Sequence, residues 1–335
     1  MTSKYSQPVK LFSFYNEKHE DGQNNYIFGD KSIPVFHKSP GVLTPPLDLV
    51  AGVNKYFVKP YFPTIPSQWD LLTYIHNTVG LSLQHIIDHS QIVCYRGFLK
   101  NLTLIPLGEH FSHSYIVFMY NEIVFIERIE TSENPLSKKE IEKQYMKKKL
   151  NKFCTKQSVD KYSNVDLNEN YFVTKTRVFQ TAKSTIKVMF TEGADAKNPH
   201  SKSEENDSME IKICPGHITH IFRGSALHKT WAQSFISGNE LIAIGIRKDT
   251  SVNEIKLVHV SDLESKLPLP ASKIMDFVGG CLESIIDACK KYPGKCLIIP
   301  QNNFSIRIAD EETVKRIKFS NPTNCFLGAF PAKPN

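Results

Sequence analysis

Alternation of apolar and polar side chains marks several strands in this sequence. Residues 208–214, SMEIKIC, show the pattern most clearly, because successive side chains of an extended chain point to opposite faces. Glu210 and Lys212 then share one face, and the apolar residues around them share the other. The same pattern predicts further strands within residues 91–106, 114–130, 170–179, 184–190 and 239–249, and a hairpin within 296–308.

Helical periodicity marks other segments. Residues 67–80 begin at a capping serine, end at a glycine and have apolar residues at helical spacing. Residues 137–153 are rich in lysine and begin with the capping box Ser137–Glu140. Further helices are predicted within residues 228–238 and 271–294.

The order of these elements predicts the fold class and the domain organisation. Helices and strands alternate without repeats or a long linker, which favours an α+β fold with mixed β-sheets and flanking helices. We expect one domain over residues 1–335, with a core at about 40–310. Residues 196–208 are predicted to be a polar loop within it, too poor in apolar residues to pack.

Composition narrows the class of protein. The 335 residues carry a formal net charge of +7, which is compatible with a polyanionic partner such as RNA or DNA. The 7 cysteines include no C-x-x-C pair, so we expect a reducing compartment, cytosol or nucleus. Neither a secretory signal nor a run of apolar residues long enough to span a membrane is recognisable.

The strand at 208–214 also suggests a chemistry. A carboxylate and a lysine two residues apart can hold Mg²⁺ and steady phosphate charge during phosphodiester hydrolysis, once an upstream acid completes the metal site. Asp195 is a candidate for that acid. The same spacing is also typical of an ordinary solvated pair on a strand.

Several motifs in the right order resemble the DXO-type decapping exoribonuclease family of eukaryotes. The matching stretches are VCYRGFLKNLTLIP, YIVFMYNEIVFIERIET, YFVTKTRV, MEIKI and KTWAQSFISGNELIAIGIRKD. The resemblance implies a fold related to metal-dependent nuclease cores. It also implies activity on RNA 5′ ends that depends on a divalent cation, Mg²⁺ or Mn²⁺.

The resemblance assigns roles to particular residues. Arg96 matches the arginine of the first motif, a partner for RNA phosphates. Asp195 matches the acid that ends the third motif, and Glu210 and Lys212 match the fourth. Gln233 matches a glutamine near the scissile phosphate, so Arg96, Lys212 and Gln233 are the expected RNA contacts.

Two acids of the family pattern are missing. Cys154 replaces the glutamate of the second motif, and Gly193 replaces the first acid of the third. Glu192 lies one position away, and we expect it to substitute only if a bulge turns it to the other face of its strand. Without such a bulge, Asp195 and Glu210 remain as remnants of a metal site.

The lost acids make the chain similar to a non-catalytic branch of the family typified by Cutoff. That branch implies a nuclear pseudoenzyme that binds and protects RNA 5′ ends, or serves as a scaffold, in germline piRNA-precursor transcription. Its partners would be nuclear proteins of the Rhino and Deadlock type, with no cofactor and no membrane. The alternatives are an active Mg²⁺- or Mn²⁺-dependent decapping hydrolase and 5′–3′ exoribonuclease, and a protein-binding module with a closed pocket.

Overall fold

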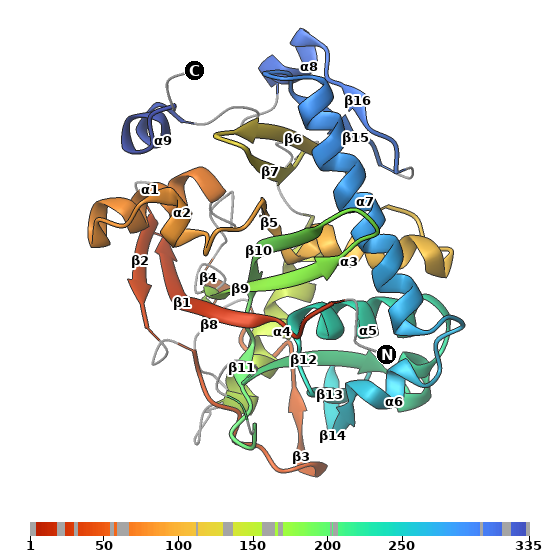
Figure 1. Ribbon diagram of the computed structural model, residues 1–335. Helices are drawn as coiled ribbons and strands as arrows, with labels where there is room; N and C mark the ends of the chain where they lie inside the picture. Colours follow the sequence, from red (N-terminus) through yellow and green to blue (C-terminus); the bar gives the residue numbers. More distant parts are fainter. Residues whose placement is uncertain are drawn as a thin grey trace.

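The structure is a computed structural model, and it describes residues 5–18, 24–29, 33–53, 57–58, 67–111, 113–129, 137–155, 165–166, 170–201, 203, 207–301, 304–316 and 323–332. Two mixed sheets organise this part of the chain (Figure 1).

The larger sheet has nine strands within the described residues. Their order is β16 (Arg307–Ile308), β15 (Leu297–Ile299), β6 (Tyr115–Tyr120), β7 (Ile123–Arg128), β5 (Ile92–Tyr95), β10 (Thr185–Gly193), β9 (Asn170–Gln180), β1 (Val9–Lys18) and β2 (Asn24–Phe28). β5 runs parallel to both of its neighbours, β7 and β10, and the other pairs are antiparallel. A turn at Asn121–Glu122 joins β6 to β7, and both turn residues have positive φ, as tight hairpin turns require.

The smaller sheet has five strands within the described residues. Its order is β11 (Ala196–Lys197), β12 (Ser208–Pro215), β13 (Leu241–Lys248), β14 (Ser251–His259) and β3 (Gly41–Asp48). β12 and β13 are parallel, whereas β13 and β14 are antiparallel. A two-stranded ribbon joins β4 (Phe57–Val58) to β8 (Val165–Asp166). The predicted mixed sheets are therefore confirmed.

Helices flank both sheets. They are α1 (Gln68–Val79), α2 (Leu83–Ile86), α3 (Arg96–Leu104), α4 (Lys138–Thr155), α5 (Gly224–Ser237), α6 (Val260–Glu264), α7 (Ala271–Lys291), α8 (Glu311–Arg316) and α9 (Asn324–Ala329), with 3₁₀ turns η2 (Ile105–Leu107) and η4 (Ile218–Phe222). The predicted ends of α1 are confirmed, since the Ser67 side chain caps its start and Gly80 ends it in the left-handed conformation. The capping box of α4 is also present, because the Glu140 carboxylate accepts hydrogen bonds from the Ser137 amide and hydroxyl.

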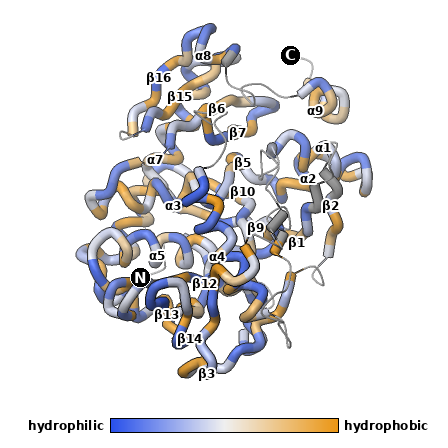
Figure 2. The backbone as a smooth tube through the Cα atoms, turned by 180° about the vertical axis from the view of Figure 1, so that it is seen from behind, coloured by the Kyte–Doolittle hydropathy of each residue, from blue (hydrophilic) through white to orange (hydrophobic). Residues whose placement is uncertain are grey.

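The larger sheet is covered on both faces. On one face, α3 and α7 pack against the strands through residues such as Phe98, Val278 and Phe190. On the other, α1 and α9 pack through Trp69 and Phe326. Figure 2 shows hydrophobic segments along these central strands and helices.

The smaller sheet lies between α5 and α4. α5 packs on one face through Trp231, and α4 packs on the other through Leu150 and Cys154. α4 approaches β13 closely, because a Cβ added at Gly245 would lie 2.9 Å from the Leu150 side chain. A glycine at 245 thus allows Leu150 to sit directly on the sheet and fixes the rotation of α4.

Two predicted segments differ from the structure. Residues 91–106 form a strand only as far as Tyr95 and then continue as α3, whose apolar residues follow helical spacing. The predicted polar loop at 196–208 begins and ends in strand pairing, because Ala196 pairs with Met209 and Lys197 with Ser208. Ala196 is buried and packs in the core beside α4. No helix in the described part of the chain is long and apolar enough to cross a membrane.

Candidate functional site

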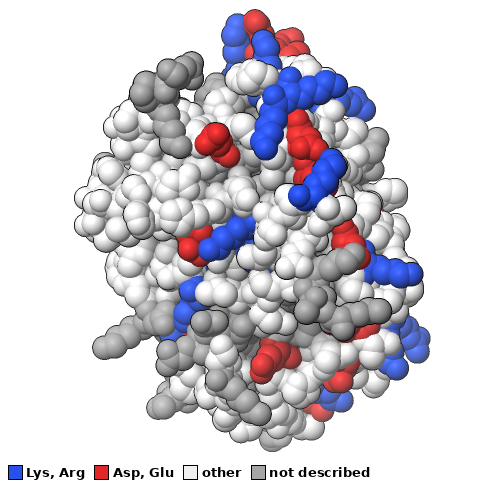
Figure 3. Space-filling model, in the orientation of Figure 1, with Lys and Arg blue, Asp and Glu red and all other residues white. Residues whose placement is uncertain are grey.

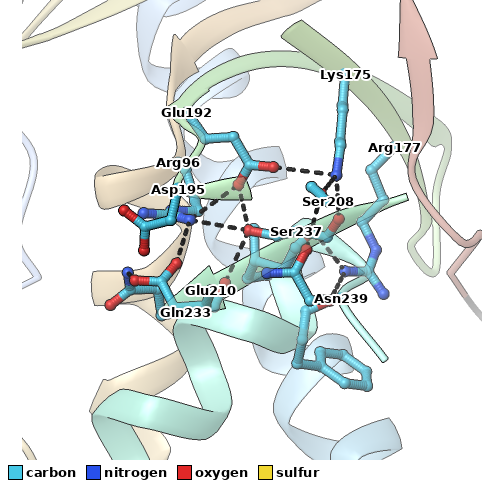
Figure 4. A network of polar contacts seen from close by, with 12 residues as sticks. Arg96, Lys175, Arg177, Glu192, Asp195, Ser208, Glu210, Gln233, Ser237 and Asn239 are labelled. Carbon is cyan, nitrogen blue, oxygen red and sulfur yellow. Dashed lines mark hydrogen bonds and ion pairs between the residues drawn. The ribbon is translucent and has the colours of Figure 1, made fainter. Parts of the chain in front are cut away.

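A buried polar network lies where the two sheets approach each other (Figure 4). Arg96 enters it from the first position of α3. Tyr95 pairs in parallel with Thr191, so the residues that follow them, Arg96 and Glu192, emerge side by side at the ends of β5 and β10. The Arg96 guanidinium Nη1 donates to Glu192 Oε2 at 3.0 Å, and lies 3.4 Å from Glu210 Oε2. One guanidinium therefore bridges two carboxylates that come from different sheets.

Glu192 has a second cationic partner. The Lys175 ammonium, from β9, lies 3.0 Å from Glu192 Oε1. Figure 4 shows Lys175 and Arg96 on opposite sides of this carboxylate. Burial would raise the pKa of Glu192, but Lys175 and Arg96 outweigh it and hold the pKa below its usual value. Glu192 is thus an ionised, fully compensated carboxylate.

Lys175 and Ser237 complete this part of the network. Lys175 is fully buried and also donates to the Ser208 hydroxyl at 2.7 Å and to the Ser237 carbonyl at 2.5 Å. The Ser237 hydroxyl donates to Glu192. A cluster of this many buried polar groups is stable only when nearly all of them are hydrogen-bonded. The hydrogen bonds therefore give the network a defined geometry.

Glu210 and Lys212 project from the same face of β12, as the alternation predicted. The Glu210 carboxylate accepts a hydrogen bond from the Gln233 amide. Lys212 Nζ donates to Gln233 Oε1 at 2.9 Å and lies 3.8 Å from Glu210 Oε1. Burial lowers the pKa of Lys212, and Glu210 opposes that shift. Gln233 therefore links the acid and the lysine.

Asp195 lies in the segment that leaves β10 for β11, where two residues of α4 and one backbone amide of β12 contact it. Asn151 Nδ2 donates to Asp195 Oδ1 at 2.7 Å, and the Ile211 amide donates to Oδ2 at 2.9 Å. The Lys147 ammonium also pairs with Oδ2. Burial would raise the pKa of Asp195, but Lys147 and the hydrogen bonds lower it. Both carboxylate oxygens of Asp195 are consequently engaged.

The structure does not place Cys154 in this network. Its side chain is buried among apolar residues next to Leu150, and burial raises the pKa of its thiol to about 12. The residues of α4 that reach Asp195 are Lys147 and Asn151, one helical turn apart. Within the described part of α4, Asn151 is therefore the uncharged position that contacts the acids, and the assignment of Cys154 as a lost acid position stays a prediction.

Glu192 joins the network although β10 has no bulge at this position. The pairing of β10 with β9 is continuous from Thr185 to Gly193. Arg96 and α5 lie on the face of β10 to which Glu192 points, so no change of register is needed. Gly193 contributes backbone to the hollows beside the network.

Three hollows meet at Gln233. The α3 cavity has a volume of about 350 Å³ and includes Arg96, Lys100 and Phe172 in its lining. The α4 groove, about 410 Å³, is lined on its helical side by Lys147, Lys148 and Lys152. The β12 groove, about 640 Å³, includes Lys143, Lys212 and Arg247. Cations outnumber acids in the lining of each, which favours an anionic ligand.

A family model described as RAI1 like PD-(D/E)XK nuclease matches residues 6–326. The chain belongs to this nuclease family. The match confirms the predicted relation to DXO-type proteins and extends beyond residues 40–310, whereas the Cutoff-like branch stays a prediction. None of the curated protein sequences compared with the chain matches it.

Solved structures of RAI1-like nucleases have the same fold. Rai1 of Candida albicans in complex with pU5 and Mn²⁺ matches with a TM-score of 0.73 at 15% identity, covering 98% of this chain and 97% of that one. Rai1 of Scheffersomyces stipitis with (3′-NADP)⁺ and calcium matches with a TM-score of 0.72 at 16% identity, covering 98% and 95%. K. lactis Dxo1 with manganese matches with a TM-score of 0.55 at 12% identity, covering 92% and 90%. At these identities the likeness shows the fold alone.

The acids of this RAI1-like chain do not fit a divalent cation as they are arranged. Mg²⁺ and Mn²⁺ need hard oxygen ligands that are not already neutralised. Here Glu192 and Glu210 share the Arg96 guanidinium, and Asp195 is held by Lys147. Among the described residues, no group of three or more His, Cys, Asp or Glu gathers as metal ligands would.

A matched pair of substitutions tests which position of α4 faces the acids. Cys154→Asp should lower the free energy of unfolding by at least about 3 kcal/mol, because it buries an unpaired carboxylate among apolar side chains. Asn151→Asp should cost less, about 1–2 kcal/mol, because it replaces the amide that donates to Asp195 by a second carboxylate, but Lys147 lies beside it and the site is half-buried. Urea unfolding of both variants measures the difference. Equal losses would contradict this placement of α4.

Proposed function

We propose that this protein binds the 5′ ends of single-stranded RNA without hydrolysing them, as a catalytically degenerate member of its family. The observation that carries the proposal is the internal neutralisation of Glu192, Asp195 and Glu210 by the protein's own cations. A metal ion would have to displace Arg96 and Lys147 to use these acids. Hydrolysis that depends on such a metal is correspondingly disfavoured.

The hollows around the network favour a polyanionic ligand, because cations outnumber acids in their linings. Figure 3 shows charges of both signs scattered over one face of the molecule, without a large field of one sign. The cations that line the α4 and β12 grooves include four lysines of one helix, α4: Lys143, Lys147, Lys148 and Lys152. A positively charged groove of this kind suits the backbone of a single-stranded nucleic acid. The C. albicans Rai1 structure holds pU5, which favours RNA as the polyanion here.

This proposal assigns the RNA contacts to residues other than Arg96, Lys212 and Gln233, which the sequence predicted. Arg96, Lys212 and Gln233 contact the acids or each other, so their first role is to compensate the network. Lysines of α4 are better placed to meet RNA phosphates. Lys143 lines the β12 groove, and Lys152 lines the α4 groove.

The biological setting is the second part of the proposal. We propose that the protein acts in the nucleus, in a role like that of Cutoff, with partners of the Rhino and Deadlock type in piRNA-precursor transcription. The support is the combination of a nuclease fold with neutralised acids. The rival, an active Mg²⁺- or Mn²⁺-dependent decapping nuclease, is favoured by one observation: Glu192 lies in the same network as Glu210.

The salt dependence of RNA binding tests the proposal. Affinity for single-stranded RNA should fall as salt rises, with each neutralised phosphate adding about 0.7 to the slope. Lys143→Gln with Lys152→Gln should reduce the slope by about 1.4, because each lysine is proposed to meet one phosphate.

The same helix supplies a matched control. Lys138 and Lys139 are exposed on the first turn of α4, and neither lines the α4 or β12 groove. Lys138→Gln with Lys139→Gln removes the same charge and should leave the slope nearly unchanged. Equal effects of the two double variants, or no binding by the wild type, would contradict the proposal.

A further inference from the structure

Lys100 lies in the α3 cavity, one helical turn after Arg96. The lining of this cavity also includes Arg128 and His113. Within the described part of the chain, the Lys100 ammonium makes no hydrogen bond and no ion pair. In this respect Lys100 differs from Arg96, Lys147, Lys175 and Lys212, each of which has a carboxylate partner.

The charges that face Lys100 are mostly of its own sign. They are Arg96 on α3, Lys212 on β12 and Lys229 on α5, with Glu210 as the acid that opposes them. The two acids of the cavity lining are already engaged. Glu192 is held by Arg96 and Lys175, and Glu127 accepts a hydrogen bond from the Gln68 amide at 2.9 Å.

We propose that Lys100 binds the terminal phosphate of the RNA 5′ end in the α3 cavity, and that it makes the protein prefer 5′-phosphorylated RNA to 5′-hydroxyl RNA. This inference rests on the proposed function and adds the group that is recognised. A phosphate supplies the negative charge that the fold does not provide around Lys100. The cavity volume of about 350 Å³ lies in the range of small-ligand sites.

The preference should depend on pH. Burial, and then the neighbouring cations, lower the pKa of Lys100 to about 8. Lys100 is therefore cationic below that pH, and its attraction for phosphate should be lost as pH rises through it. Burial also lowers the pKa of His113, with Arg128 and Lys100 acting in the same direction. His113 is consequently neutral between pH 7 and 9, and the phosphate, with a second pKa near 6, stays a dianion.

The experiment compares two RNAs of one sequence, with 5′-phosphate or 5′-hydroxyl ends, by fluorescence anisotropy at pH 7 and pH 9. The wild type should prefer the 5′-phosphate by about tenfold at pH 7 and much less at pH 9. Lys100→Gln should abolish the preference at both pH values. Lys100→Arg should keep it at pH 9, because arginine stays charged.

Two controls separate the inference from the proposed function. Lys183→Gln removes a charge from an exposed pair with Asp287 and should leave the preference unchanged. The melting temperature of Lys100→Gln should not fall, because the substitution removes repulsion among cations. Wild-type protein that binds both RNAs equally, or Lys100→Gln that weakens both equally, would overturn the role of Lys100 and leave RNA binding standing. Failure to bind either RNA would overturn the proposed function as well.

Discussion

Replacing Arg96 by methionine is expected to lower the free energy of unfolding by about 3–5 kcal/mol at pH 7. The substitution leaves Glu192 and Glu210 without their shared guanidinium, and both are buried. Lys175 still pairs with Glu192, but Glu210 keeps only the Gln233 amide and one cation, Lys212, at 3.8 Å. Removing one partner of a buried ion pair costs more than the pair contributes, because the remaining charge stays desolvated.

The pH dependence of this loss checks its cause. Glu192 has a lowered pKa in the folded protein, so its contribution to stability is present above the unfolded pKa of about 4.5 and is lost as pH falls below it. In Arg96→Met that lowering is weaker. The difference between variant and wild type should therefore shrink as pH falls from 7 to 4, because Glu192 of the unfolded chain then becomes protonated.

Urea unfolding at pH 7 and pH 4 measures both effects. Lys183→Met is the control, because Lys183 and Asp287 form an exposed pair that should contribute less than about 1 kcal/mol. A loss below about 1 kcal/mol for Arg96→Met at pH 7 would contradict the bridging role of Arg96. So would a loss that grows as the pH is lowered.

Much of the fold could be predicted where a local pattern decides the structure. The alternation in residues 208–214 places Glu210 and Lys212 on one face and packs Met209 and Ile211 in the core beside α4. Capping residues likewise fixed the ends of α1 and the start of α4, because they satisfy backbone groups within a few residues.

The prediction was wrong where tertiary packing decides. Residues 91–106 contain a β-branched start, Ile92 and Val93, and then Phe98, Leu99 and Leu102 at helical spacing. The β-branched start alone predicts a strand for the whole stretch. The change of period after Tyr95 was the signal for α3.

The rotation of α4 could not be obtained from its own sequence. Lysines lie on several sides of α4, so its sequence does not show which side faces solvent. The contact of Leu150 with Gly245, on a strand distant in the sequence, decides which residues of α4 face Asp195. Lys175 was missed for a different reason. A lysine between two threonines in the middle of β9 reads as exposed, yet all three are buried, and such a lysine signals a buried acid partner.

Weak binding of divalent cations at the polar network is the second large expected effect. Three carboxylates, Glu192, Asp195 and Glu210, face four cations, Arg96, Lys147, Lys175 and Lys212. The cluster therefore has no excess negative charge to repay the dehydration of a divalent ion. We expect Mg²⁺ and Mn²⁺ to bind no more tightly than about millimolar by calorimetry, and micromolar binding would contradict this.

Hydrolysis should be reduced by several powers of ten relative to a site with metal-bound acids, because water activation and charge stabilisation both depend on the metal. The Asp195→Ala variant supplies the control. It removes the acid held by Lys147 and Asn151, so any turnover that belongs to this site must disappear with it.

The most direct measurement is a long incubation of the protein with 5′-triphosphate RNA and Mn²⁺, in which pyrophosphate and mononucleotides are quantified against a buffer blank. We predict no product above the blank for the wild type. Turnover that is present in the wild type and absent in Asp195→Ala would show that the acids recruit a metal despite their cations, and would contradict the account.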